Sequence, residues 1–139
     1  MRRATVVLCA LFLMTLAGCA SPTTPKPAEF VDYTRQGGLL GINDHLVVMD
    51  NGAATLTRRD GNATFTVDSA QLAKLRDELT AADFDHLDPT YGPEYGCCDQ
   101  FTHRLRYQNR SVRALDDVAP ERLRRVLNTL SEIIATGSR

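Results

Sequence analysis

The sequence has no tryptophan, and aromatic residues make up only 6% of its 139 residues. A hydrophobic core must therefore come mainly from leucine, valine and isoleucine. An excess of positive charge is also missing: the formal net charge is −1, and loss of Arg2 and Arg3 with the N-terminus would make it −3. This balance argues against nucleic acid as a partner, because nucleic acid requires a basic face. The apolar run Ala4–Ala17 is shorter than the roughly 20 residues that cross a bilayer as a helix.

Motifs of catalysis and cofactor binding are missing as well. There is no G-x-S-x-G, no H-E-x-x-H and no phosphate-binding loop, and "GGLLG" (Gly37–Gly41) lacks the dinucleotide fingerprint. Cys97, Cys98, Asp99 and His103 lie close together, but the spaced cysteine pairs typical of structural zinc are absent. We therefore predict a protein that is not an enzyme, with no catalytic residues, metal or cofactor.

The N-terminus carries a recognisable targeting signal. Two arginines precede the short apolar run, which ends in Leu16-Ala17-Gly18-Cys19. This pattern is typical of a secretory signal and resembles the lipobox of bacterial lipoproteins. The resemblance implies that residues 1–18 are a signal peptide and that Cys19 is the lipidated first residue of the mature chain. The alternative is an ordinary signal peptide cut after Ala20.

A lipoprotein signal implies a place in the cell envelope, anchored to a membrane on its extracytoplasmic side. Each buried CH₂ of an acyl chain contributes about 0.8 kcal/mol, so two or three chains hold a small domain almost permanently. Residues 19–29 after the cysteine are rich in proline and threonine. Such a composition is typical of an extended tether. We expect one folded domain over residues 30–136.

Strand patterns occupy six short segments of this domain. Alternation is clearest from Phe101 to Gln108, and Asn51-Gly52 is a strong hairpin signal that predicts a type I′ turn. The predicted strands are 31–33, 46–49, 55–59, 64–67, 101–108 and 111–115, and residues 88–99 are expected to form a loop.

Two helices complete the pattern. Asp68 is placed to cap the first, and Pro120 suits the first helical position of the second. Apolar residues recur at helical spacing from Leu123 to Ile134. The sequence predicts an α+β fold of order β-β-β-β-α-β-β-α, with an antiparallel sheet of about five to six strands and both helices packed on one face.

Cys97 and Cys98 are adjacent in the exported part of the chain. An oxidising compartment favours disulfides, but neighbouring Cα atoms lie about 3.8 Å apart, whereas ordinary disulfides span about 4.4–6.8 Å. A strained vicinal disulfide, two free thiols, or bonds to another chain are the three alternatives.

Two histidines lie in different surroundings. His103 lies on the apolar face of its strand and is expected to be a hydrogen-bonded, partly buried residue. His86 lies among Asp83, Asp85 and Asp88, which could form an acid–base cluster or a cation site, or simply a solvated helix end.

A glycine-rich corner comprises Gly37, Gly38, Leu39, Leu40 and Gly41. Its two leucines are either tucked into the core or displayed to solvent. If they are displayed, two leucines on a glycine hinge form a contact point for a protein partner.

Four segments resemble emfourin and its relatives, small protein inhibitors of the thermolysin-like metallopeptidase protealysin. They are "RQGGLLGI" (Arg35–Ile42), "FDHLDPTY" (Phe84–Tyr91), "DQFTHRLRY" (Asp99–Tyr107) and "PERLRRVLNTLSEII" (Pro120–Ile134). The chain departs from that family at Cys97-Cys98, at Gln100 and in its lipobox. The resemblance implies a non-enzymatic inhibitor whose partner is a surface or secreted metallopeptidase. The alternative is an envelope-maintenance lipoprotein without a peptidase partner.

The lipobox makes a direct prediction about the mature product. Intact-mass and peptide mass spectrometry should find a chain that begins at Cys19 and carries acyl groups, because the thiol is the acceptor. A Cys19→Ser variant should lack the acyl groups. An unacylated start at any other residue would contradict the anchor and the location inferred from it.

Overall fold

The computed structural model describes residues 25–94 and 99–138. Cys19, Cys97 and Cys98 lie outside these ranges. The described elements in chain order are β1 (Glu29–Gly37), β2 (Ile42–Met49), β3 (Ala53–Arg58), β4 (Gly61–Thr66), α1 (Ser69–Ala81), the short 3₁₀ helix η1 (Phe84–His86), β5 (Thr90–Tyr91), β6 (Phe101–Tyr107), β7 (Arg110–Leu115) and α2 (Glu121–Gly137).

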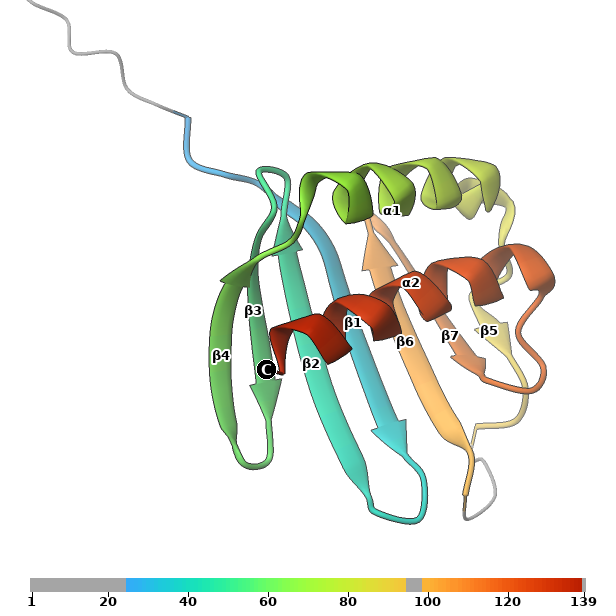
Figure 1. Cartoon of the computed structure of the whole chain (residues 1–139). Helices are drawn as coiled ribbons and strands as arrows, with labels where there is room; N and C mark the ends of the chain where they lie inside the picture. The colour runs from blue at the N-terminus through green and yellow to red at the C-terminus, as the bar shows by residue number, and fades with distance from the viewer. Residues whose placement is uncertain (1–24, 95–98, 139) are drawn as a thin grey trace, which may run out of the picture.

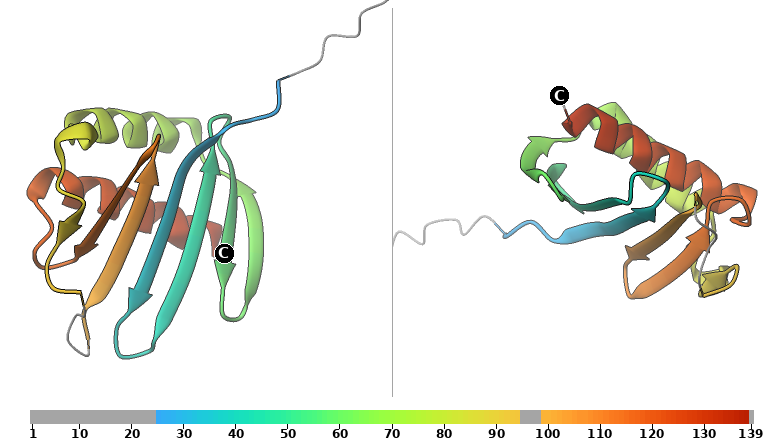
Figure 2. Two further views of the ribbon diagram at one scale, coloured as in Figure 1. Left: turned by 180° about the vertical axis from the view of Figure 1, so that it is seen from behind. Right: turned by 90° about the horizontal axis from the view of Figure 1, so that it is seen from below.

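The molecule has two layers, a seven-stranded sheet and a pair of helices. The strand order is β4-β3-β2-β1-β6-β7-β5, so β1 lies at the centre. Figure 1 shows α1 and α2 side by side across the sheet, and Figure 2 shows that they cover the same face and leave the other open. The predicted α+β class, the mainly antiparallel sheet and the two helices are confirmed.

The core lies between the helices and the covered face of the sheet, called here the inner face. Alternate strand residues point inward: Val31 and Tyr33 of β1 are fully buried, and Tyr33 pairs with Leu46 on one side and Leu105 on the other. The helices contribute a stripe that repeats every three or four residues. Its buried members are Leu72, Leu75, Leu79, Leu123, Val126, Leu127, Thr129, Leu130, Ile133 and Ile134.

The helix starts follow their sequence signals closely. Asp68 caps α1, where its carboxylate accepts a hydrogen bond from the Ala70 N–H at 2.8 Å. Pro120 is the residue before α2 rather than its first helical residue, since its carbonyl accepts from the N–H groups of Leu123 and Arg124. The first strand also begins two residues earlier than expected, at Glu29.

The predicted number of strands is wrong. The sheet has seven strands because β5 forms within the segment that was expected to be a loop, and β5 runs parallel to β7. This strand is two residues long, and its hydrogen bonding involves residues far along the chain: the Arg113 N–H donates to the Pro89 carbonyl at 2.9 Å. A strand that short carries no periodicity, so sequence reasoning missed it.

The turn between β2 and β3 is also not the predicted type I′ turn. Gly52 has a φ of 87°, but Asn51 is not among the residues with positive φ, which a type I′ turn requires at both central positions. The Gly52 N–H donates to the Met49 carbonyl, and the Asn51 side chain accepts from the Ala53 N–H. The asparagine stabilises the turn with its side chain instead of with a left-handed backbone.

Thr129 of α2 is 1% exposed, and its buried hydroxyl has no hydrogen-bond partner within the described structure. Thr129→Val should raise the free energy of unfolding by about 1–2 kcal/mol, because a methyl group replaces an unpaired buried hydroxyl and the two residues have similar helix propensity. Urea unfolding measures the change.

The control is Thr136→Val on the exposed side of the same helix, which should change the free energy of unfolding by less than about 0.5 kcal/mol. A loss of stability in Thr129→Val beyond that of the control would show that the buried hydroxyl has a partner in solution.

Candidate functional site

The β1–β2 turn has a backbone that only glycine fits. Gly37, Gly38 and Gly41 have φ values of 117°, 69° and 58°, in the left-handed region that other residues rarely adopt. A Cβ on Gly37 would lie 2.3 Å from the Gln100 carbonyl oxygen, and one on Gly38 would lie 2.9 Å from the Phe101 ring. The turn is thus pressed against the start of β6.

Hydrogen bonds hold this turn in one conformation. The Gly38 N–H donates to the Gln100 carbonyl at 3.2 Å, and the Gly41 N–H donates to the Gly38 carbonyl at 3.0 Å. From the next hairpin, Arg59 donates to the Gly41 carbonyl at 3.0 Å. The turn is therefore fixed from both sides.

Leu39 and Leu40 are displayed at the tip of this turn. Their exposed fractions are 86% and 85%, while Val118, the other exposed large hydrophobic residue within the described ranges, reaches 46%. Of the two alternatives for the corner, the structure therefore has the leucines facing solvent. We call residues 37–41 the leucine loop.

Beside the leucine loop, the inner face of the sheet carries charged groups. Arg35 lies directly opposite Asp44 on β2 and opposite His103 on β6. Asp44 is 4% exposed and binds two guanidinium groups: Arg35 Nη2 lies 2.6 Å from Oδ2, and Arg58 Nε lies 3.1 Å from Oδ1. A buried carboxylate needs such partners, because burial without them is costly.

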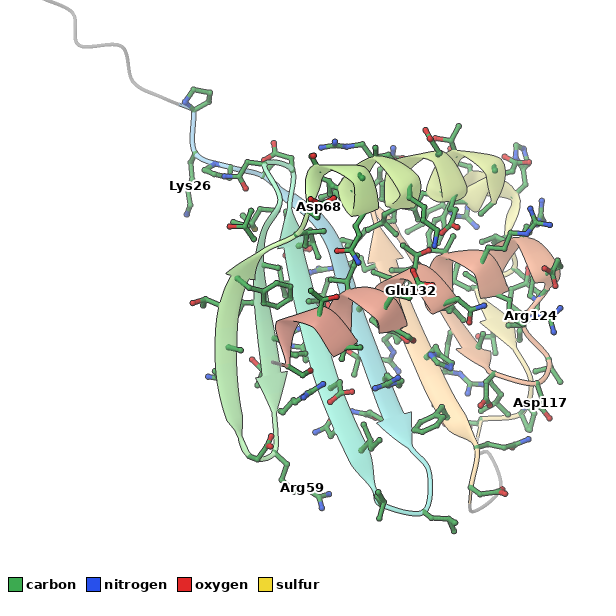
Figure 3. The ribbon with its side chains drawn as sticks, in the orientation of Figure 1. Lys26, Arg59, Asp68, Asp117, Arg124 and Glu132 are labelled. Carbon is green, nitrogen blue, oxygen red and sulfur yellow. The ribbon has the colours of Figure 1, made fainter. Side chains whose placement is uncertain are left out.

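These groups line a hollow of about 480 Å³, called here the arginine hollow. Figure 3 labels Arg59 at the tip of the β3–β4 hairpin, on the same edge of the molecule as the β1–β2 turn. The lining residues are Arg35, Leu40, Gly41, Ile42, Asn43, Asp44, Arg58, Arg59 and Asp60.

On the other side of Arg35, Tyr33 and His103 form a buried pair. The Tyr33 hydroxyl hydrogen bonds His103 Nδ1 at 2.7 Å, and the two rings are parallel. Burial lowers the pKa of His103 to about 4 and raises the pKa of Tyr33 to about 12. Both groups are therefore neutral at pH 7. The hydrogen bond expected for His103 is confirmed, and at 6% exposed the residue is buried more completely than expected.

A small hollow next to this pair brings His103, Asp116 and Ser131 together, which the sequence did not reveal. The three residue types of a hydrolase triad are present, but the hydrogen bonds differ. Ser131 Oγ donates to the Leu127 carbonyl, and Asp116 accepts from the Phe101 N–H. A nucleophile must hydrogen bond its base, and a base of pKa about 4 is weak at neutral pH. The geometry does not match nucleophilic catalysis.

The cluster around His86 has the form of a solvated helix end. His86 Nδ1 lies 2.7 Å from Asp83 Oδ1, and the His86 side chain is 77% exposed. Arg122 approaches the same aspartate at 3.9 Å. Of the three aspartates near His86 in the sequence, only Asp83 contacts it among the described contacts. No three metal-binding side chains gather as a site within residues 25–94 and 99–138.

Comparison with family models, curated proteins and solved structures finds no match for this chain. The resemblance to emfourin therefore stays a prediction that rests on sequence motifs. None of the helices in the described part of the chain is long and apolar enough to span a bilayer.

The Tyr33–His103 pair predicts a specific acid sensitivity. His103 binds a proton near pH 6.5 when unfolded and near pH 4 when folded, so acid favours the unfolded chain. The free energy of unfolding should fall by about 3 kcal/mol through this group between pH 7 and pH 4. In the fold, Tyr33, Arg35 and Asp116 are the ionisable groups that act on it.

Urea unfolding at pH 4 to 7 of the wild type and of His103→Gln measures the effect, since the variant lacks the titrating ring. The wild type should lose about 3 kcal/mol more than the variant over this range. His86→Gln, at an exposed histidine, is the matched control and should follow the wild type. Parallel curves for the wild type and His103→Gln would contradict the assignment.

Proposed function

We propose that this protein is a lipid-anchored domain on the extracytoplasmic side of a membrane, without enzymatic activity, that binds a protein partner through the leucine loop. By its resemblance to emfourin, the partner is a thermolysin-like metallopeptidase, which the domain inhibits. One observation carries the proposal: two adjacent leucines are almost fully exposed on a turn of fixed conformation.

The energetics of the leucine loop favour a binding role. Burying one leucine side chain at an interface contributes about 1.5–3 kcal/mol. A turn that is already held in one conformation loses little entropy on binding, which is how protease–inhibitor complexes gain affinity. Exposure of both leucines in the free protein is unfavourable, and a partner would offset that cost.

The position of the leucine loop agrees with an anchor at the N-terminus. In Figure 1, residues 25–28 lead into β1 at one end of the strands, and the β1–β2 turn lies at the opposite end. The nine residues of β1 separate the two by about 25–30 Å. An anchor at Cys19 would therefore attach at the end of β1 that lies away from the leucine loop.

The test is inhibition of thermolysin-like peptidases by the full chain in mild detergent, measured as the rate of peptide cleavage. Leu39→Ser and Leu40→Ser should each weaken inhibition by about tenfold or more, because each removes a side chain worth about 1.5–3 kcal/mol at an interface. The matched control is Val118→Ser, at an exposed apolar residue outside the leucine loop, which should inhibit like the wild type.

If several such peptidases cleave at an unchanged rate, the peptidase partner is wrong, and an envelope-maintenance role is the better interpretation. If inhibition occurs but survives both leucine substitutions, the leucine loop is not the contact.

A further inference from the structure

We propose that the arginine hollow is a carboxylate-binding site that receives an acidic side chain of the protein partner while Leu40, on its rim, is buried against an apolar patch of the same partner. This inference rests on the proposed function and names the chemistry of its partner surface.

The charges in the hollow are not balanced. Three guanidinium groups line it, from Arg35, Arg58 and Arg59, against the two carboxylates of Asp44 and Asp60. Asp44 is already shared between Arg35 and Arg58, with one of its oxygens near each. The hollow therefore has one positive charge in excess, and an incoming anion would lower the repulsion between its arginines.

Hydrogen-bond donors in the hollow are also in excess. Arg35 Nε is buried and has no hydrogen-bond partner within the described structure. Arg58 Nε is close enough to Asp44 for an ion pair but lacks the geometry of a hydrogen bond. A buried donor without an acceptor is costly, and a guanidinium group binds a carboxylate with two parallel hydrogen bonds. These two Nε atoms are closed to solvent, so an incoming carboxylate first meets the guanidinium group of the exposed Arg59.

The position of the hollow makes a protein side chain the occupant that fits. Leu40 and Gly41 line the hollow, and Arg59 donates to the Gly41 carbonyl. An acidic side chain could thus enter while the apolar surface around it covers the leucines. Such an apolar contact beside a charge pair is a common arrangement in interfaces, where charge complementarity sets specificity.

Carboxylate binding can be measured without any partner. The full chain, ¹⁵N-labelled in detergent at low ionic strength, is titrated with N-acetylglutamate amide, and with N-acetylglutamine amide as its neutral isostere. The arginine Nε–H resonances of Arg35, Arg58 and Arg59 should shift in a saturable way with the first compound and not with the second. Inorganic phosphate is titrated as a third probe.

Arg59 is the residue to change, because Arg35 and Arg58 hold the buried Asp44 and their loss would endanger the fold. Arg59→Gln should weaken binding of N-acetylglutamate amide at least threefold, and Arg59→Lys should weaken it less because it keeps the charge. Arg104→Gln, on the open face of the sheet, is the matched control and should bind like the wild type.

Three results would overturn the inference: no saturable shift at the three arginines, equal shifts with the glutamine compound, or unchanged binding by Arg59→Gln. Tighter binding of phosphate than of the carboxylate would also overturn it, because the hollow would then be a site for small inorganic anions.

A second measurement links the hollow to the partner. If the full chain inhibits a peptidase, Arg59→Gln should weaken inhibition and flatten its dependence on salt, since screening acts on a charge pair that the variant lacks. Inhibition by Arg59→Gln equal to the wild type would show that no acidic side chain of the partner enters the hollow. Carboxylate binding in the absence of any inhibition would leave the hollow confirmed as a carboxylate site and the proposed inhibitor function refuted.

Discussion

The close approach of the β1–β2 turn to the start of β6 determines how the residues at this end of the strands are arranged. Because Gly37 and Gly38 have no side chains, their backbone can contact Gln100 and Phe101 directly. That contact sets β1 in register with β6, and with it the position of Arg35 opposite His103. The next two residues, both leucines, lie at the tip of this turn and face solvent.

The inner face of the sheet has an apolar region and a charged region, which meet at Tyr33. Toward the start of β1, the neighbours of Tyr33 are aliphatic. The core there is built mainly from leucine, isoleucine and valine, as the lack of tryptophan requires. Toward the β1–β2 turn the same face carries Arg35, Asp44 and Arg58. Tyr33 joins the two regions, since its ring is buried in the core while its hydroxyl reaches His103. One continuous face therefore provides both the packing that stabilises the fold and the charges of the arginine hollow.

Local patterns predicted those parts of the fold that depend on local interactions. The alternation from Phe101 and the helical spacing from Leu123 each correspond to an element, because one face of each is buried over most of its length. The parallel strand at Thr90 depends on β7, more than twenty residues later, and had no local signal. The leucine loop was identified, but whether it faced inward could not be decided from spacing. The arginine hollow had a signal that was overlooked: Arg35 and Asp44 occupy positions that alternate in phase with buried Tyr33 and Leu46.

The proposed functions of the two ends of the domain depend on each other. If the proposed anchor at Cys19 is present, the ten residues from Cys19 to Ala28 that precede β1 span at most about 35 Å, so the domain would stay near the membrane. Confinement of that kind raises the effective concentration of the domain toward any partner at the same surface. For a contact of two leucines and one charge pair, the proposed anchor would thus add to the affinity that the contact has in free solution. The proposed anchor and the modest size of the displayed surface would in this sense be matched.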